Sequence, residues 1–296
     1  MTVMRRTGWF IKSLAAAGLL LIAGQASAAL WSITYPRPLS ENDLRSEYPV
    51  ALLTLALEKT GVKYSLLPSD RILLQGKALR QLKENREVNV VWSMTDAQRE
   101  KDLLPIRIPI AKGLIGWRVF LTTKDQLKYF KAVSSMEQLM KMTPVQGEEW
   151  PDTKILQANG FNVYTVPEYP QAFSILQSGR ARLFPRSVIE VLNELESDDL
   201  PADIVLEPKL ALHYPTAMYF FVNKGNPTLA RLIETGLERA LEDGSFDALF
   251  RSTYQETLDK LDLEHRTVFE LDNPSLTSNT PLQNKKLWLL PARKDG

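Results

Sequence analysis

The sequence contains no cysteine and only two histidines, His213 and His265, among its 296 residues. Without cysteine the chain forms no disulfide and has no thiolate to serve as a nucleophile or a metal ligand. The two histidines lie far apart in the sequence, which argues against a zinc site built on a histidine pair. No glycine-rich phosphate-binding loop is present either. We therefore expect neither a metal nor a cofactor, and the usual catalytic motifs are missing.

Long apolar runs are also scarce. The run at residues 14–23 is too short to span a bilayer. It follows the positive residues Arg5, Arg6 and Lys12 and precedes Ala26-Ser27-Ala28, a pattern of small residues typical of a cleavage site. Residues 1–28 are therefore predicted to be a secretory signal peptide that is removed before Ala29, with an uncleaved anchor as the alternative. No later segment is apolar and long enough to cross a membrane.

Neither sign of charge is in clear excess. Removing the predicted signal peptide leaves 33 of the 36 Lys and Arg residues against 35 Asp and Glu residues. A nearly neutral chain without an evident basic face is an improbable partner for nucleic acid. The remaining composition, 44% hydrophobic and 24% charged, is that of an ordinary globular protein.

Strand-like and helix-like segments alternate along the mature chain, which predicts an α/β fold with parallel sheets. The alternation restarts near residue 134, where Ser134 and Glu137 suggest a capping box, so we expect two lobes. Two apolar strands, residues 117–122 and 217–223, are positioned to connect the lobes as a double hinge with a cleft beside it. In the first lobe we expect strands at residues 30–35, 62–67 and 88–92 and helices at residues 44–59 and 72–84. In the second lobe we expect strands at residues 144–146, 161–166 and 181–184 and helices at residues 152–159 and 170–178.

Three segments in this order resemble the extracellular solute-binding proteins of the polar-amino-acid-binding family. They are VVWSMTDAQREKDLLPIRIPI at residues 90–110, SILQSGRARLF at residues 174–184, and AMYFFVNKGNPTLARLIETGLERALEDGSFDALF at residues 217–250. The resemblance implies the two-lobed type 2 periplasmic binding fold and a periplasmic location. It divides the chain into residues 29–118 as the first part of lobe 1, 119–216 as lobe 2, 217–260 as the return to lobe 1, and 261–296 as a C-terminal extension.

In that family the segment after the strand that ends near Trp92 grips a ligand carboxylate. The resemblance assigns this role to Arg99 and Thr95, with Ser93 as a further candidate. An arginine offers a planar fork of donors that matches a carboxylate. From the residues alone, Arg99 is equally well read as a charge on the surface of a short helix that Asp96 caps.

Three further positions are expected to line the cleft. Trp92 is a candidate to stack on the ligand, although a tryptophan at a strand end is equally often part of the core. Tyr35 follows the first strand, where members of the family often line the cleft, so the resemblance makes it a second stacking candidate. In relatives the turn that corresponds to Gln146-Gly147-Glu148-Glu149-Trp150 presents backbone N–H groups to the ligand carboxylate, so the resemblance assigns this role to Gly147. The two glutamates of this turn are expected to point toward solvent.

One position departs from the family pattern. Relatives that bind α-amino acids have an aspartate after the Ser-Gly-Arg strand, and the nearest position here carries Arg186. An arginine facing the cleft would repel an ammonium group and attract an anion, so we expect an anionic ligand. The alternative is that Arg186 is a surface residue that pairs with Glu190.

The expected function is that of a periplasmic solute-binding protein, a monomer without enzymatic activity, that closes on a small, anionic ligand. Its expected partners are the ligand and either the permease of an ABC importer or a membrane sensor. One alternative is an enzyme on the same scaffold, a dehydratase in which Glu148, Glu149 or Glu168 acts as the acid. Another is a module that delivers its ligand to a membrane sensor without import.

Overall fold

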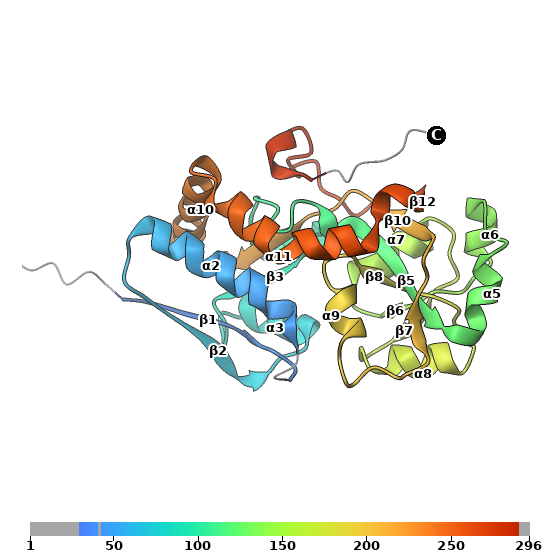
Figure 1. The fold of residues 1–296 in the computed structure, drawn as a ribbon. Helices are drawn as coiled ribbons and strands as arrows, with labels where there is room; N and C mark the ends of the chain where they lie inside the picture. The colour runs from blue at the N-terminus through green and yellow to red at the C-terminus, as the bar shows by residue number, and fades with distance from the viewer. Residues whose placement is uncertain (1–29, 41–42, 290–296) are drawn as a thin grey trace, which may run out of the picture.

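The structure is a computed structural model, and it describes residues 30–40 and 43–289. The predicted signal peptide, residues 1–28, lies outside the described residues. Figure 1 shows two lobes side by side, with the long helix α11 running from one toward the other. The α/β, two-lobed architecture predicted from the sequence is therefore confirmed.

Lobe 1 contains the N-terminal elements and the segment that returns to them. Its strands form a parallel pair, β1-β2, and an antiparallel sheet of order β3-β11-β4. The elements are β1 (Trp31–Arg37), η1 (Leu44–Ser46), α2 (Glu47–Thr60), β2 (Tyr64–Ile72), α3 (Gln75–Lys83), β3 (Val90–Met94), α4 (Ala97–Asp102), β4 (Leu104–Ile106), β11 (Met218–Val222), α10 (Pro227–Glu242) and α11 (Ser245–Leu261).

Lobe 2 is built on a five-stranded sheet in which β5 is central. Strands β8, β9 and β10 all pair with β5 in antiparallel fashion, and β12 adds to β10 in parallel. The elements are β5 (Trp117–Thr123), η3 (Lys124–Gln126), α5 (Leu127–Phe130), α6 (Met136–Met140), β6 (Val145–Gly147), α7 (Pro151–Ala158), β7 (Tyr164–Val166), α8 (Gln171–Gln177), β8 (Phe184–Ser187), α9 (Val191–Leu195), β9 (Ile204–Leu206), β10 (Leu210–His213), η4 (Leu263–His265) and β12 (Thr267–Glu270).

The core of lobe 1 is formed where α2 packs against α10. Leu52 and Leu57 of α2 and Ile233 and Leu237 of α10 are completely buried in one apolar cluster. Burying a leucine or isoleucine side chain stabilises a fold by about 1.5–3 kcal/mol. This packing makes lobe 1 a rigid support for the strands whose ends face the other lobe.

The chain crosses between the lobes at residues 107–116 and again at residues 214–217. These two crossing segments lie side by side, because the Tyr214 N–H group donates to the Gly116 carbonyl oxygen (3.2 Å) and the Ile110 N–H group donates to the Met218 carbonyl oxygen (2.9 Å). The sequence predicted two crossings at residues 117–122 and 217–223. The crossings are present, but those strands already lie inside a lobe, as β5 and β11, where they are fully paired.

The C-terminal extension adds a strand to the sheet of lobe 2, which the sequence did not predict. Strand β12 joins the sheet of lobe 2, so α11 carries the chain into that lobe a further time. Residues 271–289 then pass back to lobe 1, where the 3-10 helix η5 (Lys285–Leu287) ends the described chain beside the first crossing segment. Strand β12 is only four residues long, which is too short for its alternation to stand out in the sequence.

Two local predictions need correction. The sheets are not all parallel, because β5 and β11 are central strands with antiparallel neighbours, while β1-β2 and β6-β7 are parallel pairs. The capping box lies one residue later than predicted, with Ser135 as the N-cap of α6 and Gln138 as its reciprocal partner. A glutamine side chain can accept a bond from the N-cap backbone N–H group just as a glutamate can, and here Gln138 does so in place of the expected Glu137.

Candidate functional site

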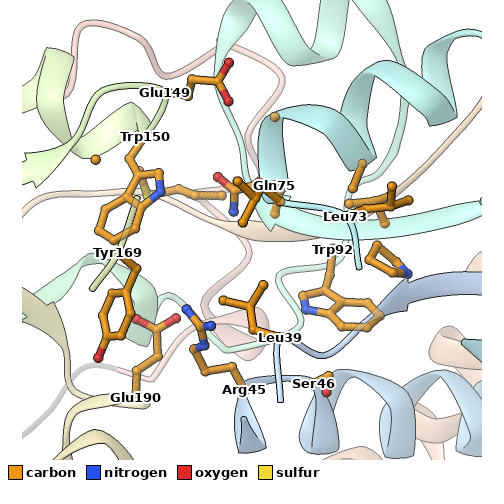
Figure 2. A pocket seen from close by; sticks show the side chains of 18 of the residues that line it. Leu39, Arg45, Ser46, Leu73, Gln75, Trp92, Glu149, Trp150, Tyr169 and Glu190 are labelled. Atoms are coloured by element: carbon orange, nitrogen blue, oxygen red, sulfur yellow. The ribbon is translucent and has the colours of Figure 1, made fainter. Parts of the chain in front are cut away.

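A cavity of about 250 Å³ lies between the two lobes. Cavities of this order hold small organic molecules. Figure 2 shows side chains of both lobes facing each other across it, with Trp92 on one side and Trp150, Tyr169 and Glu190 on the other. The lining residues used below come from η1 (Arg45), β3 (Trp92, Ser93), β5 (Arg118), the turn after β6 (Gly147, Glu148, Glu149, Trp150), α7 (Asp152), the loop before α8 (Tyr169) and the end of β8 with its following turn (Arg186, Glu190).

Aromatic rings form two walls of the cavity. Trp150 stacks on Phe184 of β8, with ring centroids 6.2 Å apart and planes inclined by 14°. The ring centroid of Tyr169 lies 6.1 Å from that of Phe184. The guanidinium carbon of Arg45, from lobe 1, lies over the Tyr169 ring at 5.2 Å from its centroid. Together with Trp92 of lobe 1, these rigid aromatic surfaces of lobe 2 favour a ligand that is at least partly planar or apolar.

The two predicted stacking residues lie together in lobe 1. Trp92 is half-buried and lines the cavity, as its position at the end of β3 suggested. The ring of Tyr35 lies 5.9 Å from that of Trp92, but Tyr35 itself is not among the lining residues. Tyr35 therefore supports Trp92 rather than forming part of the cavity surface.

Arg186 lies in the cavity wall and is neutralised there. Its side chain is 3% exposed, and its Nε donates to Glu194 at 2.8 Å while its Nη2 donates to Glu190 at 3.1 Å and also to Glu194. Burial alone would lower the pKa of Arg186, but the charges of Glu194 and Glu190 raise it well above its usual value. The surface alternative was thus right about Glu190, but Arg186 is buried, and Glu194 is its main partner.

Arg99 makes contacts with both lobes. Its Nη1 donates to Ser93 Oγ (2.6 Å) and to the Met94 carbonyl oxygen, and its Nη2 donates to the carbonyl oxygen of Glu149 in lobe 2 (3.3 Å). Asp96 caps α4, as predicted, and lies 3.6 Å from Arg99 Nε. Burial lowers the pKa of Arg99, and Asp96 opposes this shift. The guanidinium group is not among the cavity-lining groups.

Ser93 and Thr95 point in different directions. Ser93 lines the cavity, and its hydroxyl oxygen accepts the bond from Arg99. The Thr95 hydroxyl donates to Glu100 Oε1 at 2.8 Å, and the same oxygen accepts a bond from Thr277 of the C-terminal extension. Thr95 lies just after the end of β3, and its hydroxyl group faces the C-terminal extension, so it is not a lining residue.

Gly147 is a lining residue at which the close approach of a ring excludes a side chain. A Cβ atom at this position would lie 2.6 Å from the indole of Trp150. The Gly147 carbonyl oxygen accepts bonds from the Trp150 N–H group (3.1 Å) and from the Thr153 hydroxyl (2.7 Å). Glu148 and Glu149 are both exposed, as expected, and Glu149 also pairs with Arg80 of lobe 1 (3.0 Å).

A buried network that the sequence did not predict forms the floor of the cavity. Arg118 of β5 is 3% exposed, its Nη2 lies 2.6 Å from Asp152 Oδ1, and its Nε donates to the Tyr214 hydroxyl at 2.8 Å. Tyr214 in turn donates to Asp152. Burial would lower the pKa of Arg118, but Asp152 raises it above its usual value. The signal in the sequence was an arginine inside an otherwise apolar strand.

Sequence reasoning also missed Arg45, Trp150, Tyr169 and Glu190. These residues lie in loops or turns around the lobe 2 sheet or in η1, where strand and helix periodicity gives no information. Trp150 carried the best available signal, because tryptophan side chains are on average largely buried.

The described ranges contain no cluster of three or more His, Cys, Asp or Glu residues that is placed to hold a metal ion. Over the same residues, none of the helices has the length and apolarity needed to cross a membrane.

Comparison with solved structures identifies the architecture. The chain superposes on a Salmonella typhimurium periplasmic binding protein with high arginine specificity at a TM-score of 0.56, with 12% identity, covering 76% of this chain and 99% of that one. It has the fold of the type 2 periplasmic binding proteins.

Two other structures show the range of proteins with this fold. The Bordetella pertussis BvgS periplasmic VFT2 domain matches with a TM-score of 0.58 and 14% identity, covering 77% of this chain and 94% of that domain. An ancestral amino acid-binding protein, a precursor of cyclohexadienyl dehydratase, matches with a TM-score of 0.54 and 15% identity, covering 76% of this chain and 95% of that protein. No protein-family model and no curated protein matched the sequence.

Proposed function

We propose that the protein binds a small organic ligand reversibly between its lobes and presents the closed form to a membrane partner. The observation that carries this proposal is the cavity lined by Trp92 of lobe 1 and by Trp150 and Tyr169 of lobe 2. A ligand stacked between these rings contacts both lobes, so it stabilises the closed arrangement by its differential affinity for that state.

The charges around the cavity support a ligand that carries a positive group. The anionic ligand expected from the sequence required Arg99 and Arg186 to face the cavity without counter-charges. Arg186 instead pairs with Glu190 and Glu194, and Arg99 donates to protein oxygens. We therefore propose a cationic or zwitterionic ligand in place of an anionic one.

The composition of the lining points the same way. Four arginines face six carboxylates, so the net charge of the lining is negative. Glu190 is the carboxylate best placed to meet a ligand cation, because it lies beside Tyr169 in the cavity and shares Arg186 with Glu194. The lining arginines are Arg37, Arg45, Arg118 and Arg186, and the lining carboxylates are Asp43, Glu148, Glu149, Asp152, Glu168 and Glu190.

The location and partners belong to the same proposal. A signal peptide at residues 1–28 would deliver the protein to the periplasm, where it would act as a monomer. The structurally similar proteins include an arginine-specific periplasmic binding protein and a histidine kinase sensor domain, which support an ABC importer permease and a membrane sensor as the two candidate partners. We propose binding without turnover, because no residue of the cavity is singled out as a dehydratase acid.

The proposal is tested by a thermal-shift screen of purified mature protein against amines, amino acids and dicarboxylic acids sorted by charge. We expect basic or zwitterionic compounds to raise the Tm, and we expect Glu190→Gln to reduce that shift. Glu196→Gln, an exposed glutamate at the end of α9, is the matched control. If only dicarboxylic acids raise the Tm, the ligand is anionic, as the sequence suggested. If mass spectrometry shows that a bound acid is converted to a product, the dehydratase alternative is favoured instead.

A further inference from the structure

The C-terminal strap, which we define as residues 266–289, is anchored in lobe 2 at its first end. Strand β12 pairs with β10, and Arg266 donates to the carbonyl oxygen of Glu207 at 2.6 Å. At the end of α7, Asn159 forms a reciprocal pair with the backbone of Asp272, donating to its carbonyl oxygen at 2.7 Å and accepting from its N–H group at 3.1 Å. The strap is thus fixed to lobe 2 up to Asp272.

The next residues of the strap are bound to the hinge and to lobe 1. Asn273 Nδ2 donates to the Pro215 carbonyl oxygen in the second crossing segment at 3.0 Å. The Ser275 carbonyl oxygen accepts from the Ala97 N–H group of α4 at 3.0 Å, and Thr277 donates to Glu100 of the same helix at 3.0 Å. Only three peptide steps separate Asp272 from Ser275, and such a length of chain spans at most about 11 Å.

The last part of the strap packs on the first crossing segment. Trp288 covers Gly113, where a Cβ atom would lie 2.4 Å from the indole ring, and the Leu289 N–H group donates to the Lys112 carbonyl oxygen at 2.9 Å. Lys112 and Gly113 both have positive φ angles, 48° and 80°, so this crossing contains a sharp left-handed turn. The side chain of Lys112 is buried and donates to the Lys286 carbonyl oxygen at 3.2 Å.

We propose that the C-terminal strap limits how far the two lobes move apart. The short connection between its anchors on α7 and α4 ties the lobes together beside the hinge, and Trp288 holds one crossing segment in a fixed turn. The ligand-free protein therefore samples a narrower range of openings than a two-segment hinge alone would allow. This inference rests on the lobe movement of the proposed function, but it needs no knowledge of the ligand.

The test measures the distance between the lobes in the ligand-free protein. Because the chain has no cysteine, Lys77→Cys in α3 and Lys154→Cys in α7 provide two unique sites for spin labels, and both lysines are exposed. The test variant carries Gly-Ser-Gly-Ser inserted after Pro274. We expect its distance distribution, measured by pulsed electron paramagnetic resonance, to widen and to extend by up to about 13 Å, the reach that four residues add.

A matched insertion and a point variant complete the test. The same four residues inserted after the exposed Asp198 in lobe 2 are expected to leave the distribution unchanged. Asn159→Ala, which removes both bonds to Asp272, is expected to widen it in the same direction but less. If the insertion after Pro274 and Asn159→Ala both give the distribution of the unmodified chain, the strap does not restrain the lobes. That result would leave ligand binding, which the thermal-shift screen tests, unaffected.

Discussion

Replacing Arg186 with methionine tests the charge balance on which the proposed ligand depends. The substitution keeps much of the aliphatic volume but removes the guanidinium group that binds Glu194 and Glu190. The side chain of Glu194 is only 7% exposed, so water cannot replace Arg186 as its partner. Breaking a buried ion pair by removing one partner lowers the free energy of unfolding by about 3–5 kcal/mol. For a protein of this size the Tm should fall by roughly 10 °C.

Urea denaturation at neutral pH measures this loss. Arg231→Met is the matched control, because Arg231 pairs with Glu234 on the exposed surface of α10 and should change the free energy by less than about 1 kcal/mol. Adding Glu194→Gln to Arg186→Met should recover at least half of the loss, since the uncompensated charge is then removed. A loss of less than about 1 kcal/mol for Arg186→Met would refute the reasoning, because it would mean that Glu194 is hydrated and that Arg186 is available to a ligand anion.

Two further predictions concern the hinge and the surface ion pair between Lys59 and Asp243 in lobe 1. Gly113→Ala should lower the free energy of unfolding by about 1–2 kcal/mol, because alanine is disfavoured at the positive φ angle of this position. The contact of the new Cβ atom with Trp288 should lower it further. Adding Trp288→Ala should remove the loss due to this contact but not the loss due to the backbone angle. Asp243, which accepts hydrogen bonds from Lys59 and Ser245, has its pKa lowered to about 2. This depressed pKa stabilises the fold above the unfolded-state pKa of Asp, and the contribution is lost as the pH falls through about 2. A carboxyl-carbon NMR titration should show this pKa, and Lys59→Met should raise it toward 3.8, whereas an unchanged value would assign the shift to Ser245 alone.

The sequence predicted the architecture better than the contents of the cleft. Strand and helix periodicity located β3, β5, β8 and β11 to within a few residues, because apolar runs of this kind are set by local burial. The cavity-lining residues Trp92, Ser93 and Gly147 lie at or near strand ends, and Ser93 and Gly147 were named from the family resemblance. Arg45 and Tyr169, by contrast, come from an irregular segment and a loop, where no periodicity applies.

The partner of a charged residue was the hardest property to predict. Arg186 pairs mainly with Glu194, which a five-residue helix brings back toward the strand, whereas the sequence suggested Glu190 alone. Thr95 was assigned to the ligand, but its hydroxyl bonds to Glu100, which the distant Thr277 also contacts. Glu194 and Glu100 lie close in sequence to Arg186 and Thr95, but turns rather than strand or helix periodicity bring these pairs together. The contact of Thr277 with Glu100 joins residues far apart in the chain, and the sequence contains no local signal for it.

The assignment of a cleft that binds a small molecule is tested most directly by native mass spectrometry of the mature protein mixed with a library of amino acids and amines. The account predicts a one-to-one complex with at least one compound, or with a molecule that copurifies with the protein. The complex should be lost in the double variant Trp150→Ala, Tyr169→Ala, whose residual fold is checked by circular dichroism. A complex that persists unchanged in the folded double variant would contradict the account, as would the absence of any bound molecule.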